Sequence, residues 1–497
     1  MRKLLGLMVA TIFLANGCGT RDSEVLGPYS SALSTPSEPG QHLRDPMGRV
    51  HRGSWVDQVS YDFASGTYPS GPLSIGPDGA YYGTTIEGGA STYGTVYKVT
   101  ASGTLHVLQS FDFTDGFQPD TGVTRDASGN LYGTTFEGGD SNNEYCQAGC
   151  GVAFSLANSG SGYHFSLLHE FGANSNDGVW PMSGFTMDSS GNLFGTTDAG
   201  GPGSCRYGVT APFGCGTVYK LTKTASGFTY RVIYDFQGGS DGGDPVGGVA
   251  IDSSGNVFGT TSRGGHGCHS SIETGCGTVF ELTPSGSNYT KTTIYEFGGK
   301  KNGDGAYPQT NIILDSAGFI YGTTQQGGGT VYKLIKCSAV TCAYPYKVYW
   351  LDDLSNTGSA SESSVPSALV EDSAGHLYGT TTPTGYGAAG GTAFEVNASD
   401  GSMTTIFEFG NSTLGLNPSG SLVIYNTDDL YGVTESGGSH EGGTIYQLAN
   451  LQRRQLSSRS SMGALLPIAP AHRILYSPKA RPQEEAPNLG AYRNQTK

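Results

Sequence analysis

A four-residue motif, an aromatic residue followed by Gly-Thr-Thr, recurs seven times and constrains the fold more than any other feature. Six copies read Tyr/Phe-Gly-Thr-Thr, and the last reads Tyr-Gly-Val-Thr. The copies begin at Tyr82, Tyr132, Phe194, Phe258, Tyr321, Tyr378 and Tyr431. Successive copies lie between 50 residues (Tyr82 to Tyr132) and 64 residues (Phe194 to Phe258) apart. A period of this length is typical of β-propeller blades or of solenoid units.

Each repeat divides into four short runs with the pattern of strands. In the second copy they cover 122–126, 131–135, 151–156 and 165–171, and a Ser-Gly-Asn turn separates the first two. Gly followed by Asn is a good hairpin signal, because both residues tolerate φ > 0. The glycine inside the motif has no side chain, so we expect neighbouring backbones to approach closely there. The 79 glycines and the charged fraction of only 14% also favour an all-β chain.

The two ends of the repeat region complement each other. Residues 56–63 resemble the fourth run of later repeats, such as 232–236, but no repeat precedes them, and the last repeat stops after its third run at 443–448. The N-terminal strand can therefore complete the last blade and leave no open sheet edge. An open solenoid, the alternative, needs a cap at each end, and none is evident. We predict a seven-bladed β-propeller of four-stranded antiparallel blades over 55–448.

The N-terminus has the pattern of a targeting segment. A basic start and an apolar run over 4–14, too short for a membrane span of about 20 residues, predict a signal peptide at 1–17. An uncleaved anchor is the alternative. Gly17-Cys18 resembles a bacterial lipobox, although Ala15 stands where leucine is usual, so we predict a lipid on Cys18, with plain cleavage nearby as the alternative. That lipid would be the chain's membrane contact.

The segments that flank the repeats differ from them in composition. Residues 18–54 contain Ser-, Pro- and Gly-rich stretches and predict a disordered linker. Residues 449–497 carry eight Lys or Arg against two Glu, with many polar residues and no repeat motif. They predict a disordered basic tail, for which a role in sorting is the alternative.

Cysteine spacing independently favours export. Apart from Cys18, the eight remaining cysteines form four close pairs, Cys146/Cys150, Cys205/Cys215, Cys268/Cys276 and Cys337/Cys342. Locally paired cysteines in even number predict four disulfides made in an oxidising compartment. Zinc is the competing interpretation, but no C-x2-C spacing occurs and the pairs belong to different repeats. We therefore predict no metal site.

Charge and missing motifs limit the functions open to the chain. Residues 55–448 hold 13 Lys plus Arg and 36 Asp plus Glu, a net charge of −23, which disfavours nucleic acid and anionic polysaccharide. Cations, neutral glycans and basic protein surfaces remain, and solubility alone also explains the charge. No nucleophile elbow, metalloprotease motif or phosphate-binding loop is present, so we predict no catalytic residue and no cofactor. Paired loop carboxylates for glycoside cleavage stay possible.

A second repeated motif, D-G-x-x-P, marks the predicted connections between blades. In a propeller these connections lie on the same face as the loops between second and third strands, so we expect any ligand there. The candidate binding residues are Asp115, Asp177, Trp180, Asp241, Asp304 and Tyr307. Aromatic rings beside carboxylates suit sugars or cations. The alternative is structural, because Asp-Gly favours a turn and proline fixes the start of the next strand.

The combined pattern L-Y-G-T-T-x-x-G-G and G-T-V-Y/F-K/E-L-T, clear at 216–222 and 277–283, resembles the GloVer tandem repeat of bacterial choice-of-anchor proteins. The resemblance spans all seven units and implies an exported, surface-associated propeller, but no agreed activity. Members of this family usually have a C-terminal anchor, and this chain departs from that pattern. Anchoring is therefore expected at Cys18. We predict a monomeric, exported, non-enzymatic binding or scaffold module for a glycan or protein partner. The alternative is a hydrolase or lyase acting on polysaccharide.

Overall fold

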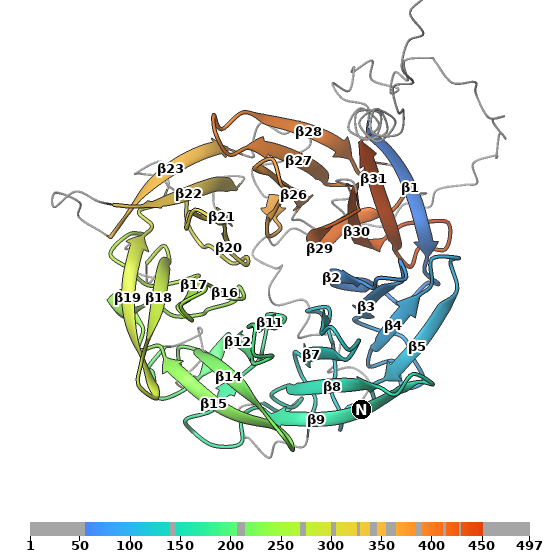
Figure 1. Cartoon of the computed structure of the whole chain (residues 1–497), viewed down its shortest axis with the longest axis horizontal. Helices are drawn as coiled ribbons and strands as arrows, with labels where there is room; N and C mark the ends of the chain where they lie inside the picture. The colour runs from blue at the N-terminus through green and yellow to red at the C-terminus, as the bar shows by residue number, and fades with distance from the viewer. Residues whose placement is uncertain are drawn as a thin grey trace, which may run out of the picture. The chain divides into compact units, whose positions relative to one another are not determined.

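The computed structural model is built almost entirely of β-strands. It describes residues 55–139, 146–205, 214–268, 275–299, 305–325, 329–337, 345–353, 364–383, 390–410, 414–426 and 429–450. Seven antiparallel sheets surround a central axis as the blades of a propeller, which confirms the predicted fold (Figure 1). Among the described residues, no helix is long and apolar enough to cross a membrane.

The blades follow one another along the chain, and each runs from an inner to an outer strand. The first consists of β2 (Pro69–Ile75), β3 (Tyr81–Thr85), β4 (Thr95–Val99) and β5 (Leu105–Ser110). The second consists of β6 (Thr124–Arg125), β7 (Leu131–Thr135), β8 (Val152–Asn158) and β9 (Tyr163–Glu170). The third consists of β11 (Thr186–Met187), β12 (Leu193–Thr197), β14 (Thr217–Thr224) and β15 (Gly227–Asp235). The fourth consists of β16 (Ala250–Ile251), β17 (Val257–Thr261), β18 (Thr278–Ser285) and β19 (Asn288–Glu296).

The remaining three blades repeat this plan with small variations. The fifth consists of β20 (Ile313–Leu314), β21 (Ile320–Thr324), β22 (Thr330–Lys336) and β23 (Tyr346–Asp353). The sixth has a divided inner strand and consists of β24 (Ser364–Pro366), β25 (Val370–Glu371), β26 (His376–Pro383), β27 (Thr392–Asn397) and β28 (Met403–Glu408). The seventh consists of β29 (Leu416–Tyr425), β30 (Asp429–Ser436), β31 (Thr444–Asn450) and β1 (Trp55–Asp62). A short extra ladder pairs β10 (Gly178–Val179) with β13 (Ala199–Gly200), and one 3-10 turn covers Gly239–Asp241.

The N-terminal strand closes the ring as predicted. β1 pairs antiparallel with β31, from Trp55 opposite Asn450 to Asp62 opposite Thr444. The backbone N–H of Phe63 continues the ladder by donating to the carbonyl of Gly443 at 2.9 Å. The last blade therefore combines the first strand of the described chain with the last three, and β1 covers the edge of β31 that would otherwise be open.

The glycine of the repeat motif makes room for an aromatic ring. In the third blade Gly195 lies directly opposite Tyr219 on the next strand, and a Cβ added to Gly195 would lie 2.4 Å from the tyrosine oxygen. The same crowding occurs at each motif, at Gly83, Gly133, Gly259, Gly322, Gly379 and Gly432. We expected the motif glycine to allow a close approach of a neighbouring backbone. The structure shows a close approach, but the neighbour is the side chain of a residue on the next strand.

The two threonines of the motif join strands and blades. The second threonine bonds to the threonine that begins the third strand, as Thr197 does with Thr217 at 2.9 Å. The first reaches the next blade, as Thr196 does when its hydroxyl donates to the carbonyl of Gly247 at 3.0 Å. Both threonines are buried. Because buried hydroxyl groups need partners, these bonds satisfy the threonines and fasten adjacent sheets. The hydroxyls of Thr260 and Thr380 are the exceptions, with no partner among the described residues.

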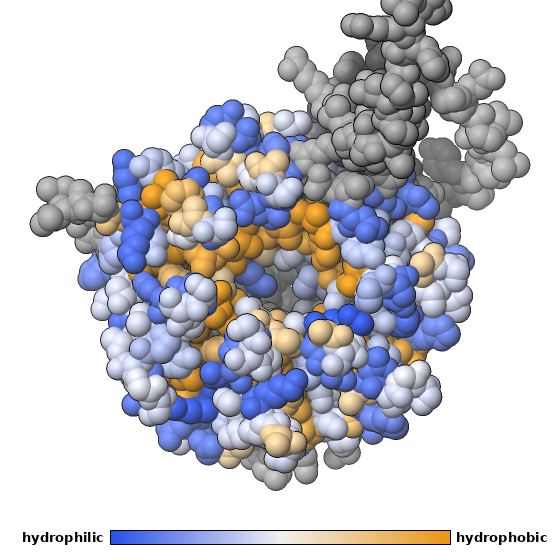
Figure 2. Space-filling model, in the orientation of Figure 1, coloured by the Kyte–Doolittle hydropathy of each residue, from blue (hydrophilic) through white to orange (hydrophobic). Residues whose placement is uncertain are grey.

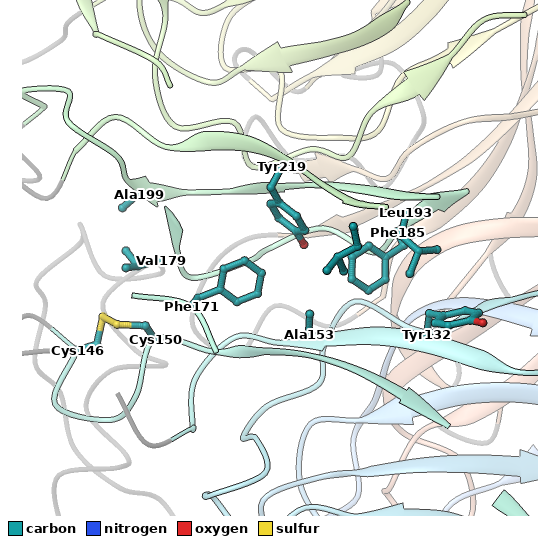
Figure 3. Packing of buried hydrophobic residues seen from close by; sticks show 11 residues of the cluster. Tyr132, Cys146, Cys150, Ala153, Phe171, Val179, Phe185, Leu193, Ala199 and Tyr219 are labelled. Atoms are coloured by element: carbon teal, nitrogen blue, oxygen red, sulfur yellow. A yellow bond between two sulfur atoms is a disulfide. The ribbon is translucent and has the colours of Figure 1, made fainter. Parts of the chain in front are cut away.

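The hydrophobic core lies between neighbouring blades. One cluster combines Ala153 and Phe171 of the second blade with Leu193 and Tyr219 of the third, and their side chains converge between the two sheets (Figure 3). The rings of Phe171 and Tyr219 are 5.1 Å apart in an edge-to-face arrangement. Such pairs add to the stabilisation that burial provides.

The buried aromatic residue of the third strand gives a prediction for stability. Tyr219 is fully buried, and its hydroxyl has no hydrogen-bond partner among the described residues, whereas the second and fourth blades carry Phe154 and Phe280 at this place. We expect Tyr219→Phe to leave the free energy of unfolding unchanged or to raise it by about 1 kcal/mol, because an unpaired buried hydroxyl is removed. Chemical denaturation of the full chain measures this.

Tyr132→Phe is the matched control. The hydroxyl of Tyr132 donates to Asp126 at 3.1 Å, so its loss should lower the free energy of unfolding by about 1 kcal/mol. A larger loss for Tyr219→Phe than for Tyr132→Phe would contradict the assignment of an unsatisfied hydroxyl.

Candidate functional site

The two faces of the ring differ in character. The connections between blades and the loops between second and third strands share one face, called here the connection face. Phe117 of a connection pairs with Glu137 of such a loop, and Gly178 pairs with Gly200 in the same way. The opposite face, called here the turn face, carries the turns at 126–130, 188–192 and 252–256.

The turn face repeats one turn in the second, third and fourth blades. Asp126 accepts hydrogen bonds from the backbone N–H groups of Ser128 and Asn130, both at 2.9 Å. Asp188 and Asp252 make the same two contacts in the following blades. These contacts define the turns and are satisfied locally, so the turns of these three blades are alike.

The predicted aspartates Asp115 and Asp177 hold the turns of the connection face. Asp115 accepts from the backbone N–H of Asp112 at 2.8 Å and from the amide of Gln109 at 2.6 Å, and burial raises the pKa of its carboxyl. Asp177 is buried and bonds to His169 at 2.9 Å and to the hydroxyl of Tyr230 at 2.7 Å. Both carboxyls thus have structural partners within the connections.

Asp241 occupies the same place in the fourth blade. Its carboxyl accepts from the backbone N–H of Gln237 at 2.8 Å, from the hydroxyl of Tyr234 at 2.7 Å and from Lys291 at 2.9 Å. The fourth predicted aspartate, Asp304, lies outside the described residues. A role of these aspartates in binding stays a prediction, and their contacts agree with the structural alternative for the D-G-x-x-P motif.

The predicted aromatic residues Trp180 and Tyr307 precede the proline that begins the inner strand. Both have left-handed backbone, with φ of 59° and 58°, and both are half-buried. The backbone N–H of Trp180 donates to the carbonyl of Cys150, and that of Tyr307 donates to the carbonyl of Cys276, each at 2.9 Å and each across to the preceding blade. They belong to the third and fifth blades, so the predicted residues are distributed around the connection face and do not form one cluster.

Three disulfides also lie on this face, in the loops between second and third strands. Cys146–Cys150, Cys205–Cys215 and Cys268–Cys276 are bonded as predicted. Cys337 is disulfide-bonded, and its predicted partner Cys342 lies outside the described residues, as does Cys18. Within the described part of the chain, no group of three or more His, Cys, Asp or Glu could hold a metal ion.

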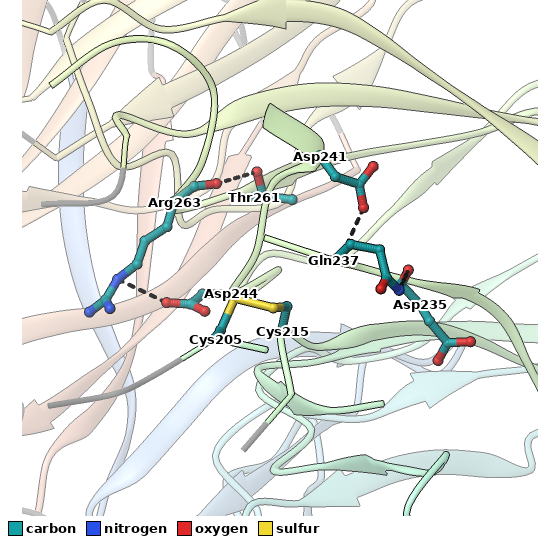
Figure 4. Close-up of a disulfide and its surroundings, with 8 residues drawn as sticks. All are labelled: Cys205, Cys215, Asp235, Gln237, Asp241, Asp244, Thr261 and Arg263. Atoms are coloured by element: carbon teal, nitrogen blue, oxygen red, sulfur yellow. Dashed lines mark hydrogen bonds and ion pairs between the residues drawn. A yellow bond between two sulfur atoms is a disulfide. The ribbon is translucent and has the colours of Figure 1, made fainter. Parts of the chain in front are cut away.

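The disulfide of the third blade packs against the next connection. A Cβ added to Gly238 would lie 2.8 Å from the sulfur of Cys205. Beside this disulfide, Arg263 pairs with Asp244 at 2.9 Å, and Asp244 also contributes to a raised pKa at Asp198, for which burial is the larger cause (Figure 4). The disulfide, the ion pair and Asp198 therefore form one packed unit between two blades.

A cavity of about 530 Å³ occupies the centre of the ring, where the space-filling view is hollowed (Figure 2). Its wall consists of the inner strands and the residues just before them. Most polar groups on it are uncharged, and they belong to Ser70, Thr121, Thr124, Ser183, Thr310, Asn311, Ser367, Thr382, Asn417, Ser419 and Ser421. No Lys, Arg or His is among the described residues that line it.

Two acidic residues that sequence reasoning missed break the uniformity of this wall. Asp120 and Glu435 come from the second and seventh blades, and Ser70 and Ser419 lie with them, their hydroxyls 3.2 Å apart. Burial and the charge of Glu435 raise the pKa of Asp120 to about 7, and one oxygen of Asp120 has no partner among the described residues. Burial also raises the pKa of Glu435, against an opposing hydrogen bond from Ser419.

A comparison of the repeats could have found Asp120. It follows the proline of its blade, where the other six blades have an uncharged residue, at Ser70, Met182, Val246, Gln309, Ser367 and Ser419. The wall can therefore offer hydroxyl and amide groups to a polar ligand, and one carboxyl that changes its protonation near neutral pH.

The sequence matches the family described as the Gloeobacter/Verrucomicrobia repeat over residues 55–209 and 203–358, more than half of the chain. The protein belongs to this family. The first match of the Gloeobacter/Verrucomicrobia repeat includes the motifs that begin at Tyr82, Tyr132 and Phe194, and the second includes those at Phe258 and Tyr321. No curated protein matches the chain.

Several solved structures are similar to the chain at low identity. A gluconolactonase from Xanthomonas campestris is 12% identical, with a TM-score of 0.38. The match covers 80% of this chain and 89% of the gluconolactonase chain. A candidate 6-phosphogluconolactonase from Bacteroides uniformis is 15% identical with a TM-score of 0.44, covering 71% and 89%. PorZ, a surface component of the type-IX secretion system of Porphyromonas gingivalis, is 13% identical with a TM-score of 0.44, covering 76% and 46%.

Proposed function

We propose that this Gloeobacter/Verrucomicrobia repeat protein is an exported, non-enzymatic binding module that holds a glycan at the central cavity on its connection face. One observation carries the proposal: the cavity is lined by many hydroxyl and amide groups and by no basic residue among those described. Hydroxyl and amide groups both donate and accept hydrogen bonds, as sugar hydroxyls do. A glycan can therefore replace water at this wall without leaving polar groups unpaired.

The size and charge of the site favour a glycan over the other predicted partners. A cavity of about 530 Å³ is in the range of small-ligand sites and is concave, whereas protein partners need broad surfaces. The net charge of −23 over 55–448, with 13 basic and 36 acidic residues, opposes anionic polysaccharides. A neutral or basic glycan fits both properties.

Disulfides support export. Three bonded pairs in separate blades are typical of proteins that fold in an oxidising compartment. We propose that a lipid on Cys18 anchors the exported chain at the cell surface, with cleavage and release as the alternative.

The second candidate function is a polysaccharide hydrolase or lyase. Its support is the pair Asp120 and Glu435, whose carboxyls both have raised pKa values in one cavity. A carboxyl with a pKa near 7 can give up or accept a proton under physiological conditions, as a general acid or base must. Glycoside cleavage needs one protonated and one ionised carboxyl, whereas burial raises the pKa of both of these, so binding remains the first proposal.

A cavity-blocking variant tests the proposed function. Ser421 lines the cavity from β29, and we expect Ser421→Trp to weaken glycan binding at least tenfold because the indole fills the space. Ser421→Thr, which keeps the hydroxyl, is the matched control and should bind like the natural chain. A glycan array on the purified full chain identifies the glycan, and calorimetry then measures the affinity of each variant.

Two outcomes would contradict the proposal. Binding that survives Ser421→Trp but is lost when the turns at 126–130 and 188–192 are altered would place the site on the turn face. Release of shortened sugars from the bound glycan, abolished by Asp120→Asn, would favour the hydrolase instead.

A further inference from the structure

The junction between the first and second blades carries an aromatic cluster on the connection face. The ring of Tyr93 lies 5.2 Å from that of Phe117 and 5.6 Å from that of Phe113. All three side chains are half-buried, so each presents part of its ring at the surface. Tyr93 immediately precedes the glycine of its third strand, where the second, third and fourth blades have the disulfide-bonded Cys150, Cys215 and Cys276. An aromatic surface therefore lies at this junction, where the next three blades have a disulfide.

The backbone at Phe113 is unusual for its residue type. Its φ is 79°, and its N–H donates to the carbonyl of Gly116, which closes the connection. The next two connections are closed by the same kind of bond from Gly172 and Gly238, with φ of 78° and 75°. A bulky residue in the left-handed region costs about 1–2 kcal/mol that glycine avoids. The presence of phenylalanine here, despite this cost, indicates that its ring has a role.

A buried carboxyl lies beside this cluster. Glu137 and Phe117 face each other and exchange both backbone hydrogen bonds, at 2.8 and 3.1 Å. Residues opposed in this way project their side chains to the same side of the ladder, so the side chains of Glu137 and Phe117 share one side. A further bond from the N–H of Gly139 to the carbonyl of Phe113 fixes the loop against the connection at 2.8 Å.

The carboxyl of Glu137 is unpaired among the described residues. Glu137 is 7% exposed, and no hydrogen bond from another described residue opposes the effect of burial on its carboxyl. Burial raises its pKa to about 7. The equivalent residues of the next two blades are Ala199 and Arg263, and the equivalent Glu87 of the first blade is exposed, so it is the burial of a carboxyl here that distinguishes this junction. A buried carboxyl without a partner is unfavourable unless a ligand supplies one.

We propose that Tyr93, Phe113, Phe117 and Glu137 form a subsite for an amino sugar with a free ammonium group; this rests on the proposed glycan binding. The rings provide an apolar surface on which a sugar ring stacks and which attracts a cation through its π face. The carboxylate supplies the counter-charge and a strong hydrogen-bond acceptor for the ammonium group. An N-acetylated sugar has no charge to offer and leaves the carboxyl unpaired.

Calorimetry with two matched oligosaccharides tests this subsite. Glucosamine oligomers and N-acetylglucosamine oligomers of equal length are titrated into the full chain at about pH 7, where a carboxyl with a pKa of about 7 is half ionised. We expect the glucosamine oligomer to bind at least tenfold more tightly, and Glu137→Gln to abolish this preference without lowering the melting temperature. Glu87→Gln is the control, because Glu87 occupies the same place after the motif of the first blade but is exposed. It should leave the preference unchanged.

The outcomes separate this inference from the proposed function. Equal binding of both oligomers, or a preference that survives Glu137→Gln, overturns the amino-sugar subsite and leaves glycan binding intact. Competition by a lysine oligomer as strong as that by glucosamine also overturns it, in favour of a general cation site. If neither oligomer nor any arrayed glycan binds, the proposed function fails as well.

Discussion

Removal of β1, residues 55–62, is expected to abolish the closed ring and to lower the free energy of unfolding by on the order of 5 kcal/mol or more. The deletion takes away the whole ladder from Trp55 opposite Asn450 to Asp62 opposite Thr444. It also uncovers the core between the last and first blades, where Tyr61 packs against Phe63 with ring centroids 4.8 Å apart. The bare edge of β31 would then be free to pair with other chains. Size-exclusion chromatography and thermal unfolding measure both effects.

Complementation in trans is the control for this deletion. A synthetic peptide of residues 55–63 should restore the monomer and most of the melting temperature, because it can occupy the vacant edge of β31. A deletion variant that stays monomeric and unfolds at the temperature of the natural chain would show that the ring does not depend on β1.

Substitution of the motif glycine has the second-largest expected effect. In Gly195→Ala the new Cβ would lie 2.4 Å from the oxygen of Tyr219 and 2.6 Å from the ring carbon that bears it. Tyr219 is fully buried between two blades, so its ring has no space into which it can move. We expect the free energy of unfolding to fall by about 3 kcal/mol, the upper part of the usual range for overpacking. Urea denaturation followed by circular dichroism measures this.

Gly162→Ala is the matched control, because a Cβ there would meet nothing within 4 Å. Its effect should stay within about 0.5 kcal/mol. The double variant Gly195→Ala/Tyr219→Leu should recover part of the loss, since the two residues are in contact and their effects should not add. Equal costs for Gly195→Ala and Gly162→Ala would refute the steric role of the motif glycine.

The fold was predictable because the motif of each blade occurs seven times in the sequence. The motif marks the second strand of each blade, and the incomplete last repeat together with the unmatched run at 56–63 predicted the closure. The reason for the motif glycine was not predictable in the same way. It depends on the register that sets Gly195 opposite Tyr219, and a repeat pattern alone does not give that register.

The candidate site was only partly predictable for a related reason. Sequence order was enough to infer that connections and second-to-third loops share a face. It could not show that Asp177 turns inward to Tyr230 of the next blade, because that contact depends on the angle between two sheets. Asp120 and Glu435 meet only because the ring closes, so their separation in the sequence conceals the pair. From the sequence alone, each of the two can be recognised only because it differs from the residues at the equivalent positions of the other repeats.

The closure also sets an order of events during synthesis. β1 is made first and its partner strand last, since Asp62 and Ser439, which meet at the junction, are separated by 377 residues. At translation rates of about 5–20 residues per second, β1 waits roughly 20 to 80 seconds for its partner. The intermediate blades can form meanwhile, because their four strands are contiguous in the chain. Joining the ends of so long a segment carries the largest loop-closure entropy in the molecule, so ring closure is expected to be the last and slowest step of folding.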